Sequence, residues 1–265
     1  MSAEHVDEAI KIKVVQDVVA IVTIDNQKKR NAISLSMCRA LGSAFDDLSA
    51  RADVKAVVLR GEGGHFCAGA DISEFSANRS DAMAGQIYDE VSDEALQSIR
   101  TCSKPVVAAV SGVAVGGGLG LALACDFRLA SSDIRMGITA ARLGLVYSID
   151  ETRLLFEKVG LTNAKEILFT GDIFTGKDCE RLSLVDRFCG EDVDAQAIEF
   201  AASMANGAPL SIRGAKAILN SLAEGSQDSA KSLLKAHIVA AFDSHDYVEG
   251  RAAFSERRKP VFRGL

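Results

Sequence analysis

The most constraining feature of this 265-residue chain is a run of three glycines between an apolar strand pattern and an apolar helix pattern. Residues 106–110 have the pattern of a buried strand, and the glycines at 116–118 open an Ala- and Leu-rich stretch with helical spacing over 117–124. Glycines at such a junction allow a sharp turn and leave the first N–H groups of the helix exposed. The helix dipole directs these groups toward an electron-rich partner, so the junction predicts a binding site for one.

A second turn of the same kind lies upstream, over residues 61–71, directly after the strand-like residues 57–59. Two such turns can direct two backbone amides at one oxygen atom, which is the arrangement of an oxyanion hole. Each turn taken alone is equally well explained as an ordinary tight turn at a strand end.

The rest of the pattern predicts an α/β core followed by helices. Repeated strand–helix order within one sheet calls for right-handed crossovers and a spiral core. After about residue 190 the strand signals end. The expected core elements are two strands within 11–25, a helix capped by Ser34, strands at 54–60 and 127–130, and a polar helix over 81–102. The expected later helices cover 193–205, 209–223, 230–242 and 247–258.

Composition narrows the function classes. The net charge of −6 argues against a nucleic-acid-binding protein, and no uncharged apolar run is long enough for a transmembrane helix. The acidic, polar residues 1–8 are unlike a secretory signal or a transit peptide. Six scattered cysteines without nearby histidines indicate reduced, buried thiols rather than disulfides or a metal site, so we expect a cytoplasmic protein. The 48% hydrophobic content leaves room for a subunit interface.

Three motifs in order give the chain a close resemblance to the crotonase (enoyl-CoA hydratase/isomerase) superfamily. They are Ala-Gly-Ala-Asp-Ile at 68–72, the stretch 104–118 continued by 122–126, and a C-terminal signature over 249–262. The resemblance implies a crotonase-type α/β spiral of repeated ββα units that binds acyl-CoA, over residues 1–190. It also implies a helical C-terminal oligomerisation region over 191–265 and assembly as a homotrimer or hexamer.

The same resemblance implies site residues. The N–H groups of Ala70 and Gly117 would bind the thioester oxygen as it gains enolate charge. CoA is part of the substrate, so no separate cofactor is expected. The positions that match CoA-binding residues of the family are Lys28, Arg30 and Ala32 at the nucleotide end, Ala68 and Ile72 beside the adenine, and Phe254 and Arg257, which reach the CoA of a neighbouring subunit. Independently of the family, residues 28–30 suit phosphates, although a solvated charge run in a loop is the alternative.

The acid–base groups depart from the family pattern. The two glutamates of its hydratases are replaced by Gly120 and Ala140, and the aspartate of its isomerases aligns with Ser148. Asp150 and Glu151 remain as candidate bases at a helix start. Residues 148–151 also form a capping box, in which Glu151 would reach back to the N–H of Ser148. This capping role favours Asp150 over Glu151 as the base.

The sequence therefore predicts a hydratase/isomerase-type enzyme that stabilises a thioester enolate with unconventional acid–base groups and hydrates crotonyl-CoA weakly. A CoA-thioester decarboxylase or hydrolase is the alternative reaction. A catalytically silent acyl-CoA-binding subunit is the alternative from another class, because both glutamates are missing.

Overall fold

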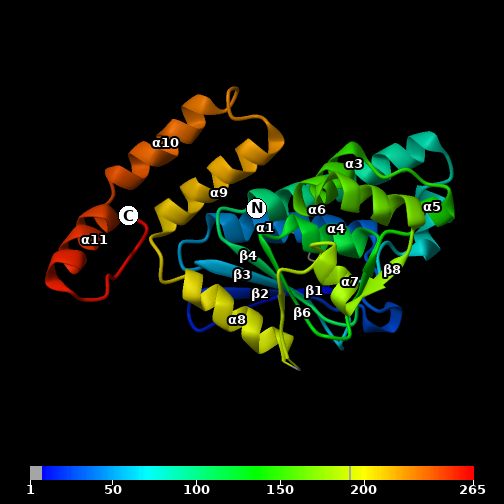
Figure 1. The fold of residues 1–265 in the computed structure, drawn as a ribbon, viewed down its shortest axis with the longest axis horizontal. Helices are drawn as coiled ribbons and strands as arrows, with labels where there is room; N and C mark the ends of the chain where they lie inside the picture. Colours follow the sequence, from blue (N-terminus) through cyan, green and yellow to red (C-terminus); the bar gives the residue numbers. More distant parts are fainter. Residues whose placement is uncertain (1–7, 191) are drawn as a thin grey trace.

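The computed structural model describes residues 8–190 and 192–265, so nearly all of the polar amino-terminal stretch lies outside the described residues. Two sheets form the core (Figure 1). The first has the order β1-β2-β3-β4-β6-β9, and its pairs are parallel except for the antiparallel β1–β2 pair. Its strands are β1 (Ile10–Val15), β2 (Val19–Ile24), β3 (Ala56–Gly61), β4 (Val106–Val110), β6 (Phe127–Ala130) and β9 (Arg187–Phe188). The second sheet contains β5 (Val113–Val115), β7 (Arg135–Gly137) and β8 (Ile173–Thr175), in the order β5-β7-β8.

Helices cover both faces of the larger sheet, as a largely parallel sheet requires. In chain order, the helices from residue 35 to residue 204 are α1 (Leu35–Ala50), α2 (Phe75–Asn78), α3 (Ala82–Thr101), α4 (Gly117–Ala124), α5 (Ala140–Leu143), α6 (Ile149–Thr170), α7 (Gly176–Arg181) and α8 (Val193–Met204). Two 3₁₀ turns are η1 (Gln27–Lys29) and η2 (Ile72–Glu74). On β3, Val57 and Leu59 point into the core cluster shared with α1, α3 and α4, whereas Val58 points into the cluster shared with α8.

Local signals in the sequence explain where several helices begin. The side chain of Ser34 accepts a hydrogen bond from the N–H of Met37, 3.2 Å away, and so caps α1 as expected. The buried face of α1 carries an apolar stripe that includes Leu41, Phe45 and Leu48. All six cysteines are free and buried.

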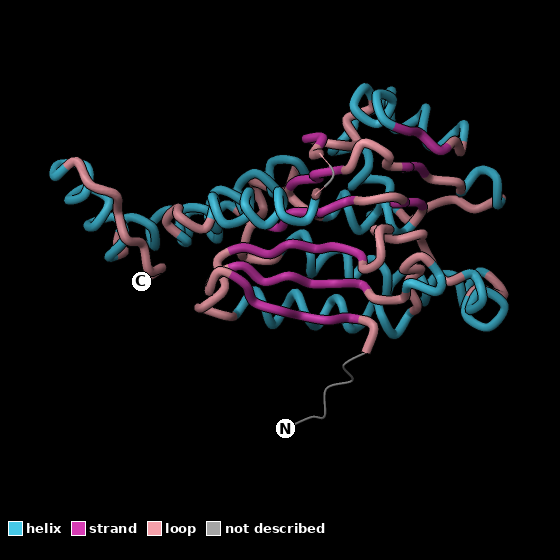
Figure 2. The backbone as a smooth tube through the Cα atoms, turned by 90° about the horizontal axis from the view of Figure 1, so that it is seen from below, coloured by secondary structure: helices cyan, strands magenta, loops and turns pink. Residues whose placement is uncertain are grey.

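Three helices follow α8 and extend away from the sheets (Figures 1 and 2). They are α9 (Pro209–Glu224), α10 (Lys231–Phe242) and α11 (His245–Glu256). Helix α11 begins two residues before the expected 247, because Ser244 caps it and accepts a hydrogen bond from the N–H of Tyr247. An apolar groove runs between these helices, and Phe254 beside it is 87% exposed. No helix in the described part of the chain has the length and apolar character needed to cross a bilayer.

Candidate active site

The first glycine turn is held by backbone hydrogen bonds on two sides. On one side, Ile33 donates to the carbonyl of Gly69 and accepts from the N–H of Asp71, both at 2.8 Å. On the other, Cys67 donates to Val113 at 2.9 Å and accepts from Val115 at 3.1 Å. Because Val113 and Val115 belong to β5, the first turn is tied to the strand that leads into the second turn.

The second turn depends on close approach of the backbone at its glycines. Gly116 has a φ of +60°, which favours glycine. A Cβ added to Gly118 would lie 2.1 Å from the carbonyl oxygen of Cys67, so only glycine fits there. A separate strand, β5, leads into this turn; the sequence pattern did not resolve it from β4, from which Gly112 at a φ of +59° divides it.

The two turns bring the N–H groups of Ala70 and Gly117 together. A Cβ on Gly117 would lie 3.8 Å from the nitrogen of Ala70, and a Cβ on Gly69 would lie 3.7 Å from the nitrogen of Gly117. Gly117 is the first residue of α4, where an N–H has no acceptor within the helix. Within residues 8–190 and 192–265, neither N–H donates a hydrogen bond to the protein. In this part of the chain the two N–H groups thus lie near each other, and neither has a protein acceptor.

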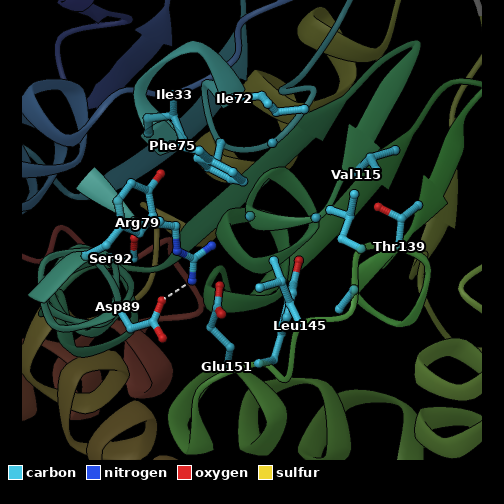
Figure 3. Close-up of a pocket in the computed structure, with 18 of the residues that line it drawn as sticks. Ile33, Ile72, Phe75, Arg79, Asp89, Ser92, Val115, Thr139, Leu145 and Glu151 are labelled. Atoms are coloured by element: carbon cyan, nitrogen blue, oxygen red, sulfur yellow. Dashed lines mark hydrogen bonds and ion pairs between the residues drawn. The ribbon is translucent and has the colours of Figure 1, made fainter. Parts of the chain in front are cut away.

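These residues line a cavity of about 120 Å³ between the glycine turns, α3 and the start of α6 (Figure 3). An apolar cavity of about 150 Å³ holds a benzene molecule, so this one admits a small apolar group. Most of the wall is apolar, including Ile33, Ile72, Phe75, Val115, Leu121, Leu143, Leu145 and Val146. Charged or hydroxyl groups come from Arg79, Tyr88, Asp89, Ser92, Thr139, Tyr147 and Glu151.

Glu151 lies in the first turn of α6 and contributes its side chain to this cavity (Figure 3). Burial, with the neighbouring carboxylates Asp93 and Asp89, raises its pKa from 4.5 to about 7. Arg79 and a hydrogen bond from the backbone N–H of Ser148 oppose this rise. The Ser148 hydroxyl accepts the N–H of Glu151 at 3.1 Å, so the expected capping box is formed. The cap does not remove the Glu151 carboxylate from the cavity.

Asp150 points the other way. Its side chain is 53% exposed, forms an ion pair with Arg153, and lines a polar groove outside the cavity. Successive residues on a helix differ by about 100° in direction, which explains why neighbours face different surroundings. The preference for Asp150 as base is therefore not supported by its position, because the capping contact leaves Glu151 lining the cavity.

Gly120 and Ala140 stand where the family's hydratases have glutamates. Gly120 lies next to the Glu151 carboxylate, and Ala140 is part of the cavity wall. A Cβ added to Gly120 would lie 3.5 Å from Oε1 of Glu151. Ala140 is buried and lines the cavity. The Glu151 carboxylate thus occupies the space next to Gly120, although it comes from another helix. The sequence did not identify Arg79 or Asp89 as site residues. Arg79 directly follows α2, and Asp89 lies ten residues later in α3, so no local sequence pattern connects the two.

The candidate CoA-binding residues fall into two groups. The first group surrounds the first glycine turn: Arg30 accepts the N–H of Ala68 at 3.0 Å, and Ile72 lines the cavity while remaining 69% exposed. Lys28 and Arg30 are exposed there and have no ion-pair partner among the described residues, and Ala32 is buried behind them. Phe254 and Arg257 form the second group, at and just after the end of α11. Helix α11 lies at the opposite end of the molecule from α5, which contributes to the cavity wall (Figure 1).

Comparison with known proteins agrees with this architecture. The Enoyl-CoA hydratase/isomerase family model matches residues 15–264. A probable enoyl-CoA hydratase of Bacillus subtilis is 34% identical, with 94% of this chain and 97% of that protein covered. A peroxisomal Delta(3,5)-Delta(2,4)-dienoyl-CoA isomerase of Arabidopsis thaliana is 30% identical, with 91% of each chain covered. The crystal structure of an enoyl-CoA hydratase/isomerase family protein from Hyphomonas neptunium superposes with a TM-score of 0.90 at 32% identity, covering 98% of this chain and 99% of that one.

The fold and these matches define an α/β protein of the crotonase class. The chain belongs to the enoyl-CoA hydratase/isomerase family and is an enzyme that acts on acyl-CoA. The expectations of family and fold class are thereby confirmed.

Proposed function

We propose that this enzyme moves a proton on an acyl-CoA thioester, with the N–H groups of Ala70 and Gly117 as oxyanion hole and Glu151 as the acid–base group. The thioester oxygen gains negative charge when a proton leaves the acyl chain, and fixed N–H donors stabilise the resulting enolate. One such donor typically lowers the barrier by about 3–4 kcal/mol. The observation that carries the proposal is that the Glu151 carboxylate and both N–H groups face one cavity.

The ionisation of Glu151 suits proton transfer in both directions. With a pKa raised to about 7 by burial, the carboxyl group is partly protonated and partly ionised at neutral pH, so it can accept a proton and return it. Asp89 also lines the cavity, but it is ion-paired with Arg79. One available carboxylate suits migration of a double bond along the acyl chain better than hydration, which in the family uses two. We therefore place isomerisation first.

The CoA moiety would lie along the first glycine turn. Lys28 and Arg30 would neutralise its phosphates, and Ala32, Ala68 and Ile72 would contact its nucleotide end. Phe254 and Arg257 are too far from this turn in their own chain to take part there, so their contribution requires a neighbouring subunit. We propose a homotrimer or hexamer for that reason, with the exposed apolar side chains of α9–α11 at its contacts.

The test of the acid–base assignment compares two neighbouring carboxylates. We expect Glu151→Gln to lower the rate of 3-enoyl-CoA isomerisation by about 10²–10⁴-fold, the usual contribution of a general acid–base group. Asp150→Asn is the matched control and should retain wild-type turnover. Proton NMR in deuterium oxide follows both the conversion to the 2-enoyl thioester and the exchange of the acyl protons.

Wild-type turnover by Glu151→Gln would refute Glu151 as the proton carrier. Retained turnover of a decarboxylation or thioester hydrolysis substrate by that variant would instead favour a reaction that relies on the oxyanion hole. Binding of acyl-CoA with neither exchange nor conversion in the wild-type protein would favour the silent acyl-CoA-binding subunit.

A further inference from the structure

Arg79 stands out in the cavity wall because its guanidinium group is held from three sides. The residue directly follows α2, and its side chain is 20% exposed. Its guanidinium forms an ion pair with Asp89 of α3 (Figure 3). Its Cζ atom also lies 4.6 Å from the ring centre of Tyr88 and 5.3 Å from that of Phe75, distances at which a cation is attracted to an aromatic face. These contacts fix the position of the positive charge.

This fixed charge and the Glu151 carboxylate face the same cavity without touching. Both side chains line it, from the end of α2 and from the start of α6 (Figure 3). Among the described residues, the ion-pair partner of Arg79 is Asp89 and not Glu151. The Glu151 carboxylate is therefore left accessible to a bound substrate while the guanidinium acts on it at longer range.

The charges around Glu151 are unequal. Helix α3 contributes the carboxylates of Asp89 and Asp93, and the cation that acts on Glu151 is Arg79. On α6 itself, Asp150 pairs with Arg153 on the outer side. The other titratable residues that line the cavity are Tyr88 of α3, Tyr147 before α6, and Cys38 of α1. Burial raises the pKa of each, which keeps them neutral at neutral pH. Helix α4 presents Gly120, which carries no charge.

Burial and two carboxylates both favour the protonated form of Glu151. A protonated carboxyl group cannot accept a proton from the acyl chain. We propose that Arg79 is a positioning residue for catalysis, which keeps Glu151 able to ionise at neutral pH, and that Asp89 holds Arg79 in place. This inference rests on the proposed function of Glu151.

The test measures the pKa of Glu151 directly, by NMR titration of protein labelled with ¹³C at the glutamate carboxyl carbon. The Glu151 resonance is the one that is absent from Glu151→Gln. We expect Arg79→Met to raise the pKa of Glu151 by about one unit or more, as loss of a nearby opposite charge does. Arg79→Lys should largely restore the wild-type value. Asp89→Asn should lower the pKa, because it removes a negative charge near Glu151 while the rings of Tyr88 and Phe75 still hold Arg79. Arg181→Met, which removes a surface cation paired with Glu166, is the control and should leave it unchanged.

The opposite signs separate an electrostatic role from loss of local structure. If Arg79 only braced α2 against α3, both Arg79→Met and Asp89→Asn would admit water to the cavity and return Glu151 toward its ordinary pKa. An unchanged or lowered pKa in Arg79→Met would therefore overturn the proposal. In Arg79→Met, the lower pH limit of kcat/KM for isomerisation should rise together with the pKa of Glu151.

These results are independent of the proposed function. Full activity of Glu151→Gln would refute Glu151 as the base even if Arg79 shifts its pKa. Conversely, inactive Glu151→Gln with an unshifted pKa in Arg79→Met would retain the base and refute the role of Arg79.

Discussion

A buried carboxyl group with a raised pKa affects stability as well as chemistry. Glu151 titrates near pH 7 in the folded protein, whereas its ordinary value is 4.5. Between these two pH values the folded state holds a proton that the unfolded state has lost, so the stabilising effect of the protonated group is lost as the pH rises through this range. Above about pH 7 the ionised side chain costs the folded state about 3 kcal/mol.

We therefore expect Glu151→Gln to be more stable than the wild-type protein at pH 8 by an amount of that order, and to differ little from it at pH 4. The neutral amide avoids the cost of ionising a buried carboxyl group. Urea unfolding of both proteins at the two pH values measures the difference in free energy of unfolding. Asp150→Asn should show no such pH-dependent gain, because that side chain is exposed. An equal effect of the two substitutions would contradict the buried position of Glu151.

The sequence predicted some residues of the site but not the directions of their side chains. The glycine turns were identified from local pattern and the candidate residues Ala70 and Gly117 from the family resemblance, and the structure brings the two residues together. The direction of Glu151 was not predictable, because it depends on how α6 is rotated when it packs against α3 and α4. The pairing of Arg79 with Asp89 was not predictable either, since it depends on the relative placement of α2 and α3.

At the scale of the elements, the site depends on the junction of β5 with α4 and its contact with the first turn. The elements themselves were largely predicted, because apolar strands, the Ser34 cap and the glycine boundaries are local signals. The division of β4 from β5 and the second small sheet were missed, because strands of three residues carry too little pattern.

The contact between the two turns can be tested with adjacent glycines. A Cβ at position 118 would meet the Cys67 carbonyl, whose hydrogen bond to Val115 restrains it. We expect Gly118→Ala to lower the free energy of unfolding by about 1–3 kcal/mol, as overpacking does, and to reduce turnover by displacing the first turn. Gly117→Ala meets its nearest atom at 3.8 Å and should keep its stability. Equal stability of the two variants in urea unfolding would show that the turns are not in tight contact.

At the scale of the whole molecule, α9–α11 extend from the α/β core and carry exposed apolar side chains, among them Leu219, Leu233, Val239, Phe242, Val248 and Phe254. Ion pairs connect this unit to the core: Arg100 of α3 pairs with Glu224 of α9, and Lys216 of α9 pairs with Asp126, at 2.8 Å. Such apolar exposure on an anchored unit is typical of a surface that is covered in an assembly.

The proposed assembly predicts that complementary defects rescue each other. Glu151→Gln removes the acid–base group of its own cavity, and Arg257→Ala removes the residue proposed to act in a neighbouring one. When the two inactive or weakened variants are mixed, unfolded and refolded together, we expect activity above the sum of the separate proteins, because some sites then combine an intact Glu151 with an intact Arg257. Refolded single variants are the controls, and native mass spectrometry reports the subunit count. If the wild-type protein is a stable monomer and binds acyl-CoA in that form, both the assembly and the shared site are contradicted.

The carboxylate beside Gly120 has a consequence for how such enzymes change over time. A functional group is located by its place in space, and two different helices can reach the same place, as α4 and α6 do here. A chain with a glutamate on each helix could therefore lose one of the two and keep a carboxylate at this place. A sequence position without its glutamate does not by itself mean an inactive enzyme.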